Sequence, residues 1–251
     1  MTNCRRVQTA SGAILAGAAR LAGDPFSTAG EALFDPQFWS ARGGIVPAGR
    51  GRGEAWFLDQ GSEQWVLRHY RRGGFVGRIS EDRYFWIGEA RVRAFAEYRL
   101  LEFLVAQGMP VPAPIAARYR RHGPSYSCDL ITRRIVGAAP LSEGLATTAL
   151  DESRWRRVGA AVGRLHAVGV DHADLNAHNI LLDALGTVSI IDFDRGRIRR
   201  AGAWTGRNLR RLRRSLLKIT ADLPADRFND AVWRSLLRGY SEHTAERTAP
   251  R

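Results

Sequence analysis

The chain has 251 residues, which suits one two-lobed domain or two small domains that share a cleft. Hydrophobic residues make up 45% of the sequence, so a folded core is expected, and no apolar run approaches the roughly 20 residues of a membrane-spanning helix. The net charge of +13 comes from 38 basic and 25 acidic residues, and every basic residue except Lys218 is an arginine. This bias indicates a GC-rich genome. It also fits an acidic partner, such as nucleic acid, phospholipid or a phosphorylated sugar, and both explanations can hold together.

The first half of the chain predicts mainly strands. Residues 1–45 are interpreted as a lead-in with one short helix over residues 35–39, because an aspartate can cap this helix and a proline fits its first turn. Two strand-like runs, at 55–58 and 65–67, flank a turn sequence and predict a hairpin.

A long helix is predicted over residues 89–107, and Gly108 ends it. Its apolar residues recur at helical spacing, as expected for one buried face: Val92, Phe95, Ala96, Leu100, Phe103 and Leu104. Three prolines at 110–114 then predict a rigid extended connector, and a strand is expected over 130–135.

The second half predicts mainly helices. Residues 151–168 form the clearest helix, with Gly169 at its end and one apolar face made of Trp155, Val158, Val162 and Leu165. Two short apolar strands follow, at 180–182 and 188–193, and the rest of the chain to about residue 240 predicts helix.

This order predicts an α+β fold with a cleft between two lobes. The β-rich N-lobe is expected at 46–135, the α-rich C-lobe at 136–241, and a polar tail at 242–251.

Four polar residues around the predicted strand pair of the second half carry the strongest chemical signal. The hairpin at 180–191 folds back on itself, so Asn179 and Asp192 should lie side by side, with Asp174 just before them. Carboxylate and amide oxygens suit Mg²⁺, a hard cation, and Asp174 could accept the proton of an attacking hydroxyl. Aspartate and asparagine beside short strands are often only turn formers. Here His172, Asp174, Asn179 and Asp192 all occur at the spacings that the hairpin requires, which favours a phosphoryl-transfer site over simple turns.

The stretch HADLNAHN at 172–179 resembles the catalytic loop of protein kinases, H-x-D-L-x-x-x-N. Residues 192–194 read Asp-Phe-Asp where that family carries D-F-G, at the same spacing, so Asp194 replaces a glycine and its role stays open. The resemblance implies a protein-kinase-like bilobal fold with ATP in the cleft, Asp174 as catalytic residue, and Asn179 and Asp192 as Mg²⁺ ligands.

The nucleotide-binding residues of the N-lobe match that pattern less closely. Gly49, Gly51 and Gly53 precede a strand and could approach phosphates, but their spacing departs from the kinase glycine loop. Arg68 stands where kinases carry a lysine, and Glu97 is the natural helix partner for it. An arginine binds phosphate with a planar fork and is not equivalent to lysine. Alternatively, Glu97 is a solvated charge on a helix surface.

Several longer stretches resemble a narrower family, the 3-deoxy-D-manno-octulosonic acid (Kdo) kinases of the bacterial lipopolysaccharide kinase group. They are RHYRRGG at 68–74, FAEYRLLEFLVAQGMPVPAPIAA at 95–117, HADLNAHNILLD with IDFDRG within 172–196, and WTGRNLRRLRRSL at 204–216. An arginine at position 68 is similar to what that family shows. The resemblance implies ATP- and Mg²⁺-dependent phosphorylation of the Kdo sugar of a Kdo–lipid A precursor, at its 4-hydroxyl. It also implies work at the cytoplasmic face of the bacterial inner membrane.

Two basic stretches suit this substrate. Arg71 and Arg72 are candidates for the Kdo carboxylate or a lipid A phosphate, since arginine forks match such groups. Residues 195–218 contain basic residues and no acidic one, so this stretch could meet the anionic inner-membrane surface as a peripheral attachment. An ordinary solvated helix face explains the same pattern equally well.

Three other functions remain open at this point. The catalytic loop does not separate Kdo from another acceptor sugar, such as a lipopolysaccharide heptose. A nucleotide-binding pseudokinase scaffold is less favoured, because Asp174, Asn179 and Asp192 are all present. A nucleic-acid-binding protein would fit the arginine runs, but no known nucleic-acid module is recognisable and no nucleic acid is expected as a partner.

Overall fold

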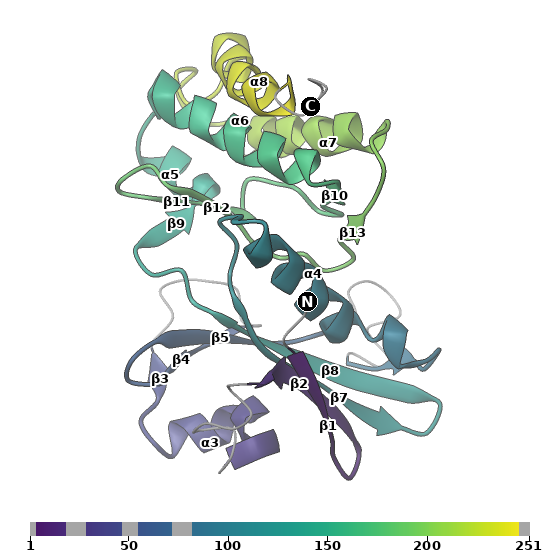
Figure 1. Cartoon of the computed structure of the whole chain (residues 1–251). Helices are drawn as coiled ribbons and strands as arrows, with labels where there is room; N and C mark the ends of the chain where they lie inside the picture. The colour runs from purple at the N-terminus through teal and green to yellow at the C-terminus, as the bar shows by residue number, and fades with distance from the viewer. Residues whose placement is uncertain (1–3, 19–28, 47–54, 72–81, 246–251) are drawn as a thin grey trace. The chain divides into compact units, whose positions relative to one another are not determined.

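The computed structural model describes residues 4–18, 29–46, 55–71 and 82–245, and the chain divides into two compact units. The first unit comprises Met1–Phe103 and Ala113–Val136, and the second comprises Leu104–Pro112 and Gly137–Arg251. Strands dominate the described part of the first unit and helices that of the second (Figure 1). The class is therefore α+β, as the order of sequence patterns predicts.

An antiparallel sheet of eight strands is the main element in the described part of the first unit. Its strands follow the order β1 (Cys4–Gln8), β2 (Gly12–Gly17), β7 (Pro114–His122), β8 (Ser125–Arg133), β5 (Gln64–His69), β4 (Ala55–Asp59) and β3 (Ile45–Val46), and β6 (Tyr84–Phe85) pairs with β8. The β4–β5 hairpin confirms the predicted one. Its turn is closed by Asp59, whose Oδ1 accepts the Gly61 backbone N–H at 2.7 Å, and Gly61 takes a φ of 86°, which glycine adopts without strain.

Two features of this sheet were not predicted. Residues 4–17 form the β1–β2 hairpin, where the sequence indicated a lead-in with a helix only, and β7 begins inside the expected proline-rich connector. β2 lies between β1 and β7, and its side chains are buried on both faces of the sheet. A strand buried on both faces shows no polar–apolar alternation, so its short apolar run cannot be distinguished from other buried segments by pattern.

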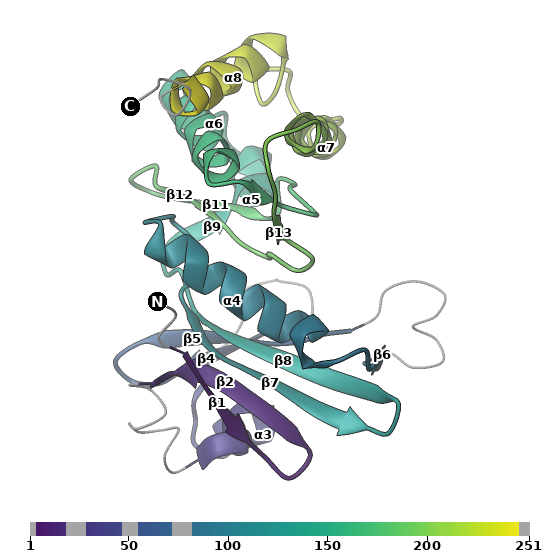
Figure 2. The same cartoon turned by 45° about the vertical axis from the view of Figure 1, so that its right-hand side comes forward.

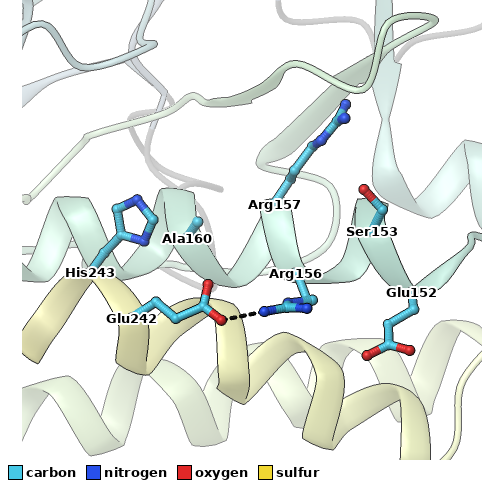
Figure 3. A pocket seen from close by; sticks show the side chains of 7 residues that line it. All are labelled: Glu152, Ser153, Arg156, Arg157, Ala160, Glu242 and His243. Carbon is cyan, nitrogen blue, oxygen red and sulfur yellow. Dashed lines mark hydrogen bonds and ion pairs between the residues drawn. The ribbon is translucent and has the colours of Figure 1, made fainter.

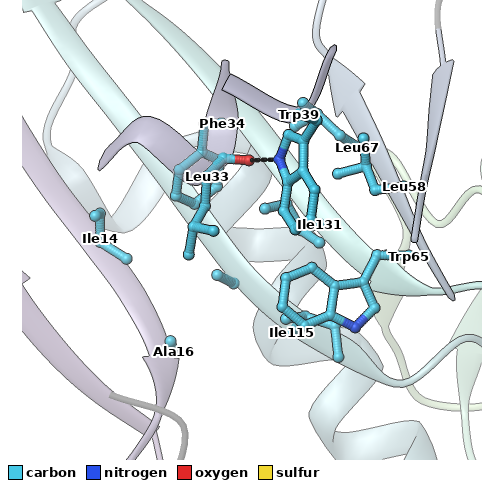
Figure 4. Packing of buried hydrophobic residues seen from close by; sticks show 11 residues of the cluster. Ile14, Ala16, Leu33, Phe34, Trp39, Leu58, Trp65, Leu67, Ile115 and Ile131 are labelled. Carbon is cyan, nitrogen blue, oxygen red and sulfur yellow. Dashed lines mark hydrogen bonds between the residues drawn. The ribbon is translucent and has the colours of Figure 1, made fainter. Parts of the chain in front are cut away.

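Helical segments cover the two faces of this sheet (Figures 1 and 2). On one face lie the 3-10 turn η1 (Gly30–Phe34) and α3 (Pro36–Ser40), which begins as predicted with Asp35 accepting the Gln37 N–H. Trp39 of α3 inserts into a buried apolar cluster and donates its indole N–H to the Leu33 carbonyl at 2.9 Å (Figure 4). The other face carries the 3-10 turn η3 (Glu89–Arg91) and α4 (Arg93–Ala106), whose residues up to Phe103 belong to this unit.

The apolar face of α4 differs from the prediction at one position. Val92, Phe95, Leu100 and Leu104 are buried as expected and Phe103 is half-buried, but Ala96 is exposed and Ala94 takes its place in the core. Gly108 ends the helix with a φ of 67°, which confirms the predicted stop.

The second unit, as far as residue 245, combines two small sheets with three long helices. The helices are α6 (Glu152–Ala167), α7 (Trp204–Ile219) and α8 (Asp230–Ala245), preceded by the shorter α5 (Leu141–Thr147). One sheet has the order β12 (Val188–Ile190), β11 (Ile180–Asp183), β9 (Ala138–Pro140), and β10 (Val170–Asp171) pairs with β13 (Arg197–Ile198).

α6 confirms its predicted start, apolar face and end. Asp151 caps it by accepting the Arg154 N–H, and Trp155, Val158, Val162 and Leu165 are all buried. α6 packs closely against α8, because a Cβ on Gly159 would lie 1.8 Å from the Leu236 carbonyl oxygen and one on Gly239 would lie 2.0 Å from that of Arg156. Only glycine permits this backbone approach. Within the described ranges, none of the helices combines the length and apolar character needed to cross a bilayer.

Candidate active site

The loop between β10 and β11 is held by His172, which is fully buried. Its Nδ1 accepts the Asp174 backbone N–H at 3.2 Å, its Nε2 lies 3.0 Å from the Ile191 carbonyl oxygen, and its ring packs against Phe193 with centroids 4.8 Å apart. Burial lowers the pKa of His172, which favours the neutral ring. With Nδ1 accepting, the neutral ring carries its proton on Nε2 and donates it to Ile191. The histidine therefore ties the loop to the strand that leads to Asp192.

The β11–β12 hairpin places the two predicted metal ligands next to each other along the ladder. Ile180 pairs with Ile190, and the Ile191 N–H donates to the Asn179 carbonyl at 3.0 Å, so Asp192 follows the residue opposite Asn179. The Asn179 amide nitrogen donates to the Asp174 carbonyl at 2.9 Å. Because the amide group is planar, this bond fixes the direction of its oxygen, Oδ1. The hairpin geometry is as predicted, while the metal-binding roles stay predictions.

Asp192 has an unusual backbone conformation, with a φ of 64°. Non-glycine residues seldom adopt this left-handed region, although aspartate and asparagine tolerate it better than most. Such outliers cluster at functional sites, where the surrounding structure holds them in place.

The donor set fits Mg²⁺ better than a protein-enclosed metal. Within the described residues, no three His, Cys, Asp or Glu side chains gather as metal ligands. One carboxylate, Asp192, and one amide oxygen, Asn179, suit Mg²⁺, which usually keeps waters and substrate phosphate oxygens as its other ligands.

Asp174 presents its carboxylate at the surface of the second unit, with 59% of the side chain exposed. Asn176 donates to its Oδ2 at 3.0 Å, and Arg211 of α7 donates to its Oδ1 at 3.3 Å. Sequence reasoning did not identify Arg211 as a partner of this residue, because the two lie 37 residues apart in the sequence.

Asn208 of α7 is a second residue that sequence reasoning missed. Its Oδ1 accepts the His172 backbone N–H at 3.1 Å and faces His166 Nε2 at 3.2 Å, while its Nδ2 donates to Asp171 at 2.9 Å. It therefore joins α6, α7 and the start of the loop. A sequence signal was present, since Asn208 lies four residues before Leu212 and eight before Leu216, on the face that packs into the core.

The proton positions on His166 follow from Asn208. Because Asn208 donates with its nitrogen to Asp171, its oxygen faces His166, so Nε2 of that ring donates and Nδ1 accepts from the Tyr240 hydroxyl at 3.0 Å. The neutral ring satisfies both contacts with one donor and one acceptor nitrogen. Burial accordingly lowers the pKa of His166 to about 4.

A pH dependence of stability follows from His166. In the unfolded chain this residue titrates near 6.5, but in the folded protein near 4, so the unfolded state binds the extra proton between these values. Stability is therefore fully present above pH 6.5 and falls as the pH falls, by about 2 kcal/mol at pH 5 from this group alone. Urea unfolding at pH 7 and pH 5 should show a smaller loss for His166→Gln than for the wild type. Equal losses in the two proteins would contradict this assignment.

In the first unit, Arg68 and Glu97 form the predicted pair. Arg68 donates from Nη2 to Glu97 Oε2 at 2.5 Å, and the Glu97 side chain is only 3% exposed, so the alternative of a solvated helix charge is wrong. Tyr70, two residues after Arg68, is buried and donates its hydroxyl to the same carboxylate oxygen. Burial, followed by the charge of Glu97, raises the pKa of Tyr70 well above its ordinary value.

The remaining predicted site residues are placed only in part. Arg71 is exposed at the end of the described segment. Gly49, Gly51, Gly53 and Arg72 lie outside the described residues.

A separate hollow lies between α6 and α8 and contains the Arg156–Glu242 ion pair (Figure 3). None of the predicted site residues lines it. It is therefore not part of the candidate site.

Comparison with known proteins shows which family this sequence resembles. The sequence model of the "Lipopolysaccharide kinase (Kdo/WaaP) family" matches residues 36–240. The chain is 45% identical over 207 residues to the 3-deoxy-D-manno-octulosonic acid kinase of Xylella fastidiosa (strain 9a5c), covering 82% of this chain and 81% of that protein. A protein of the same name from Stenotrophomonas maltophilia (strain K279a) is 48% identical over 76% of this chain and 76% of its own length. Another, from Xanthomonas axonopodis pv. citri, is 49% identical over 74% of this chain and 75% of its own length.

Proposed function

This chain belongs to the lipopolysaccharide kinase (Kdo/WaaP) family, and we propose that it transfers the γ-phosphoryl group of ATP to the 4-hydroxyl of the Kdo sugar in a Kdo–lipid A precursor. Relatives named as Kdo kinases, at 44–49% identity over most of the chain, favour Kdo over heptose as the acceptor. The bilobal arrangement with ATP in the cleft, which the resemblance implies, belongs to the same proposal.

In this proposal the residues of the second unit position the reacting groups. Asp174 orients the acceptor hydroxyl and accepts its proton, and its backbone is held by His172 and Asn179. Asn179 and Asp192 would hold Mg²⁺, which supplies positive charge to the phosphates when it is bound. The contribution of the protein is thus mainly positioning and charge, as phosphoryl transfer requires.

In the first unit, Arg68 would contact the nucleotide phosphates, and Glu97 and Tyr70 fix its guanidinium in place. Arginine binds phosphate through a planar fork, so a pre-oriented side chain loses little freedom on binding. The absence of a lysine at this position therefore does not oppose catalysis.

The observation that carries the proposal is the hydrogen-bonded loop His172–Asp174–Asn179–Ile191 in a chain whose relatives are named Kdo kinases. Mass spectrometry of a Kdo–lipid A precursor after incubation with enzyme, ATP and Mg²⁺ tests it. We expect the mass of one added phosphate, and fragmentation should place it on the Kdo 4-hydroxyl. If the Kdo precursor stays unmodified while a heptose acceptor is phosphorylated, the acceptor is another sugar. If ATP binds without turnover on any acceptor, the protein is a nucleotide-binding scaffold.

We also propose that the protein acts at the cytoplasmic face of the inner membrane, attached peripherally through charge. The basic stretch at 195–218 supports this, because Arg195, Arg197 and Arg200 are exposed beside those on α7. Juxtamembrane basic residues gain about 1 kcal/mol each from anionic lipid.

Co-sedimentation with vesicles tests this attachment. Binding should require anionic lipid and weaken as salt rises, because the Debye length falls from about 10 Å at 0.1 M to about 3 Å at 1 M. Vesicles of zwitterionic lipid alone are the matched control. If binding depends neither on salt concentration nor on lipid charge, the basic stretch is only a solvated surface.

A further inference from the structure

One exposed face of α7 is a stripe of arginines. Arg207, Arg210, Arg211 and Arg214 recur at the spacing of one helix face, and all four are exposed. Together with Arg213 and Leu217 they line an open hollow of about 370 Å³, a volume within the usual range for ligand sites. Like charges three and four residues apart repel one another and destabilise a helix. A bound anion would offset that repulsion.

The contacts of these arginines separate structural roles from binding roles. Arg213 donates to Asp230 at 2.7 Å and so links α7 to the first turn of α8. Arg211 donates to Asp174 at 3.3 Å. Within the described ranges, Arg207, Arg210 and Arg214 form no ion pair. The stripe therefore offers the guanidinium groups of Arg207, Arg210 and Arg214 to a ligand. Arg211 belongs to the same stripe and is paired with the predicted catalytic carboxylate.

The buried side of α7 fixes the stripe relative to the catalytic loop. Asn208 accepts the His172 N–H at 3.1 Å, and the Ser215 hydroxyl oxygen accepts the Ala177 N–H at 3.1 Å. Leu212 and Leu216 anchor the same side in the core. The helix is thus bonded to both ends of the loop that carries Asp174, all within the second unit. An anion bound on the stripe would lie beside the reacting carboxylate.

We propose that Arg207, Arg210, Arg211 and Arg214 bind the phosphate groups of the lipid-linked acceptor, and that Arg211 moves from Asp174 to a bound phosphate. This inference rests on the proposed function, because it takes the acceptor to be a phosphorylated glycolipid. Guanidinium groups bind phosphate by two parallel hydrogen bonds, which makes them suited to this ligand. The Arg211–Asp174 pair is largely exposed, at 46% and 59%, and such pairs are weak, so it exchanges readily.

The exchange couples acceptor binding to catalysis. While Arg211 is paired with Asp174, its guanidinium competes with the acceptor hydroxyl for Oδ1. When Arg211 turns to a phosphate, that oxygen becomes accessible to the hydroxyl proton. Arg211 is in this sense a positioning residue, and the acceptor itself prepares the carboxylate that receives its proton.

Kinetics in neutral detergent micelles test the stripe without a charged surface. The acceptor is the Kdo–lipid A precursor with its lipid A phosphates, compared with the same molecule after their removal. Wild-type enzyme should have a lower KM for the phosphorylated acceptor, and the double variant Arg210→Gln, Arg214→Gln should lose at least about tenfold of that preference. The KM for Mg-ATP should stay near the wild-type value.

Two further variants test Arg211 and the specificity of the effect. Arg211→Gln should raise the KM for the phosphorylated acceptor, and Arg211→Lys should restore part of the affinity because it keeps the charge. Arg234→Gln on α8 is the matched control, since Arg234 is exposed and has no ion pair within the described ranges. It should keep the wild-type preference for phosphorylated acceptor.

The contrary outcomes are distinct. A raised KM for Mg-ATP instead of the acceptor would assign the stripe to the nucleotide, and an effect seen only on anionic vesicles would assign it to the membrane surface. An unchanged preference in the double variant would overturn the proposal outright. Isothermal titration with the bisphosphorylated lipid A disaccharide, in the same detergent, measures the site without turnover. Arginine-dependent binding without Kdo phosphorylation would retain the phosphate site and refute the proposed function.

Discussion

Asp174→Asn is expected to lower turnover by about 10²–10⁴-fold, because the amide cannot accept the proton of the acceptor hydroxyl. The change is nearly isosteric and should leave the loop in place. Asn179 and His172 bond the backbone of residue 174, and Asn176 also donates to its backbone carbonyl. The ion pair with Arg211 is exposed and is expected to contribute less than about 1 kcal/mol to stability.

The measurement is single-turnover phosphorylation of the Kdo acceptor, with circular dichroism and thermal unfolding to verify the fold. Asp222→Asn is a matched control, because Asp222 is an exposed aspartate of the same unit and forms no ion pair within the described residues. It should retain wild-type turnover. Near-normal turnover of Asp174→Asn would refute the assignment of Asp174 as the proton acceptor.

Replacement of Asp192 is expected to abolish Mg²⁺-dependent nucleotide binding while the protein stays folded. In the wild type, Mg-ATP at 100 times its Kd should stabilise the fold by about 2.7 kcal/mol, which corresponds to a rise in Tm of roughly 5–10 °C for a chain of this size. Without the carboxylate at position 192 this rise should largely disappear, and the remaining shift should no longer depend on Mg²⁺.

The backbone at position 192 decides which variant is informative. Its φ of 64° is tolerated by asparagine but strains alanine. Asp192→Asn therefore tests metal binding at nearly constant stability, whereas Asp192→Ala combines the loss of the ligand with backbone strain. Thermal shift with ATP alone, with Mg-ATP and with EDTA separates the two effects. A wild-type Mg-ATP shift in Asp192→Asn would show that this carboxylate does not hold the metal.

Local sequence patterns were sufficient for much of the second unit. The α6 helix, its apolar face and its end at Gly169 depend on residues within a few positions of one another, and all three were predicted. The same is true of the β11–β12 hairpin, which places Asn179 opposite Ile191 through its own ladder. The catalytic loop resemblance was therefore readable because the loop and hairpin are contiguous in sequence.

Features that depend on long-range contacts were missed. β2 is buried through contacts with later parts of the chain: it pairs with β7, about a hundred residues later, and its Ile14 and Ala16 pack in the apolar cluster around Trp39. Its sequence therefore shows no strand alternation. Tyr70 was not predicted as a partner of Glu97, because nothing near it in sequence indicates this bond. Arg211 shows the same limit, since an arginine in a basic helix gives no local sign of contact with Asp174.

The sequence by itself determined the family-specific motifs and the α+β class, because these follow from local order and from residue types at fixed spacing. It also suggested the pairing of Arg68 with Glu97, which the buried contact in the structure confirmed. The tertiary structure decided how the loop is held: Asn208 and Ser215 bond both its ends to α7, and Arg211 reaches Asp174. The reason is physical. Hydrogen bonds between segments about 35 residues apart depend on how helices pack, and packing is set by the whole core rather than by any one segment.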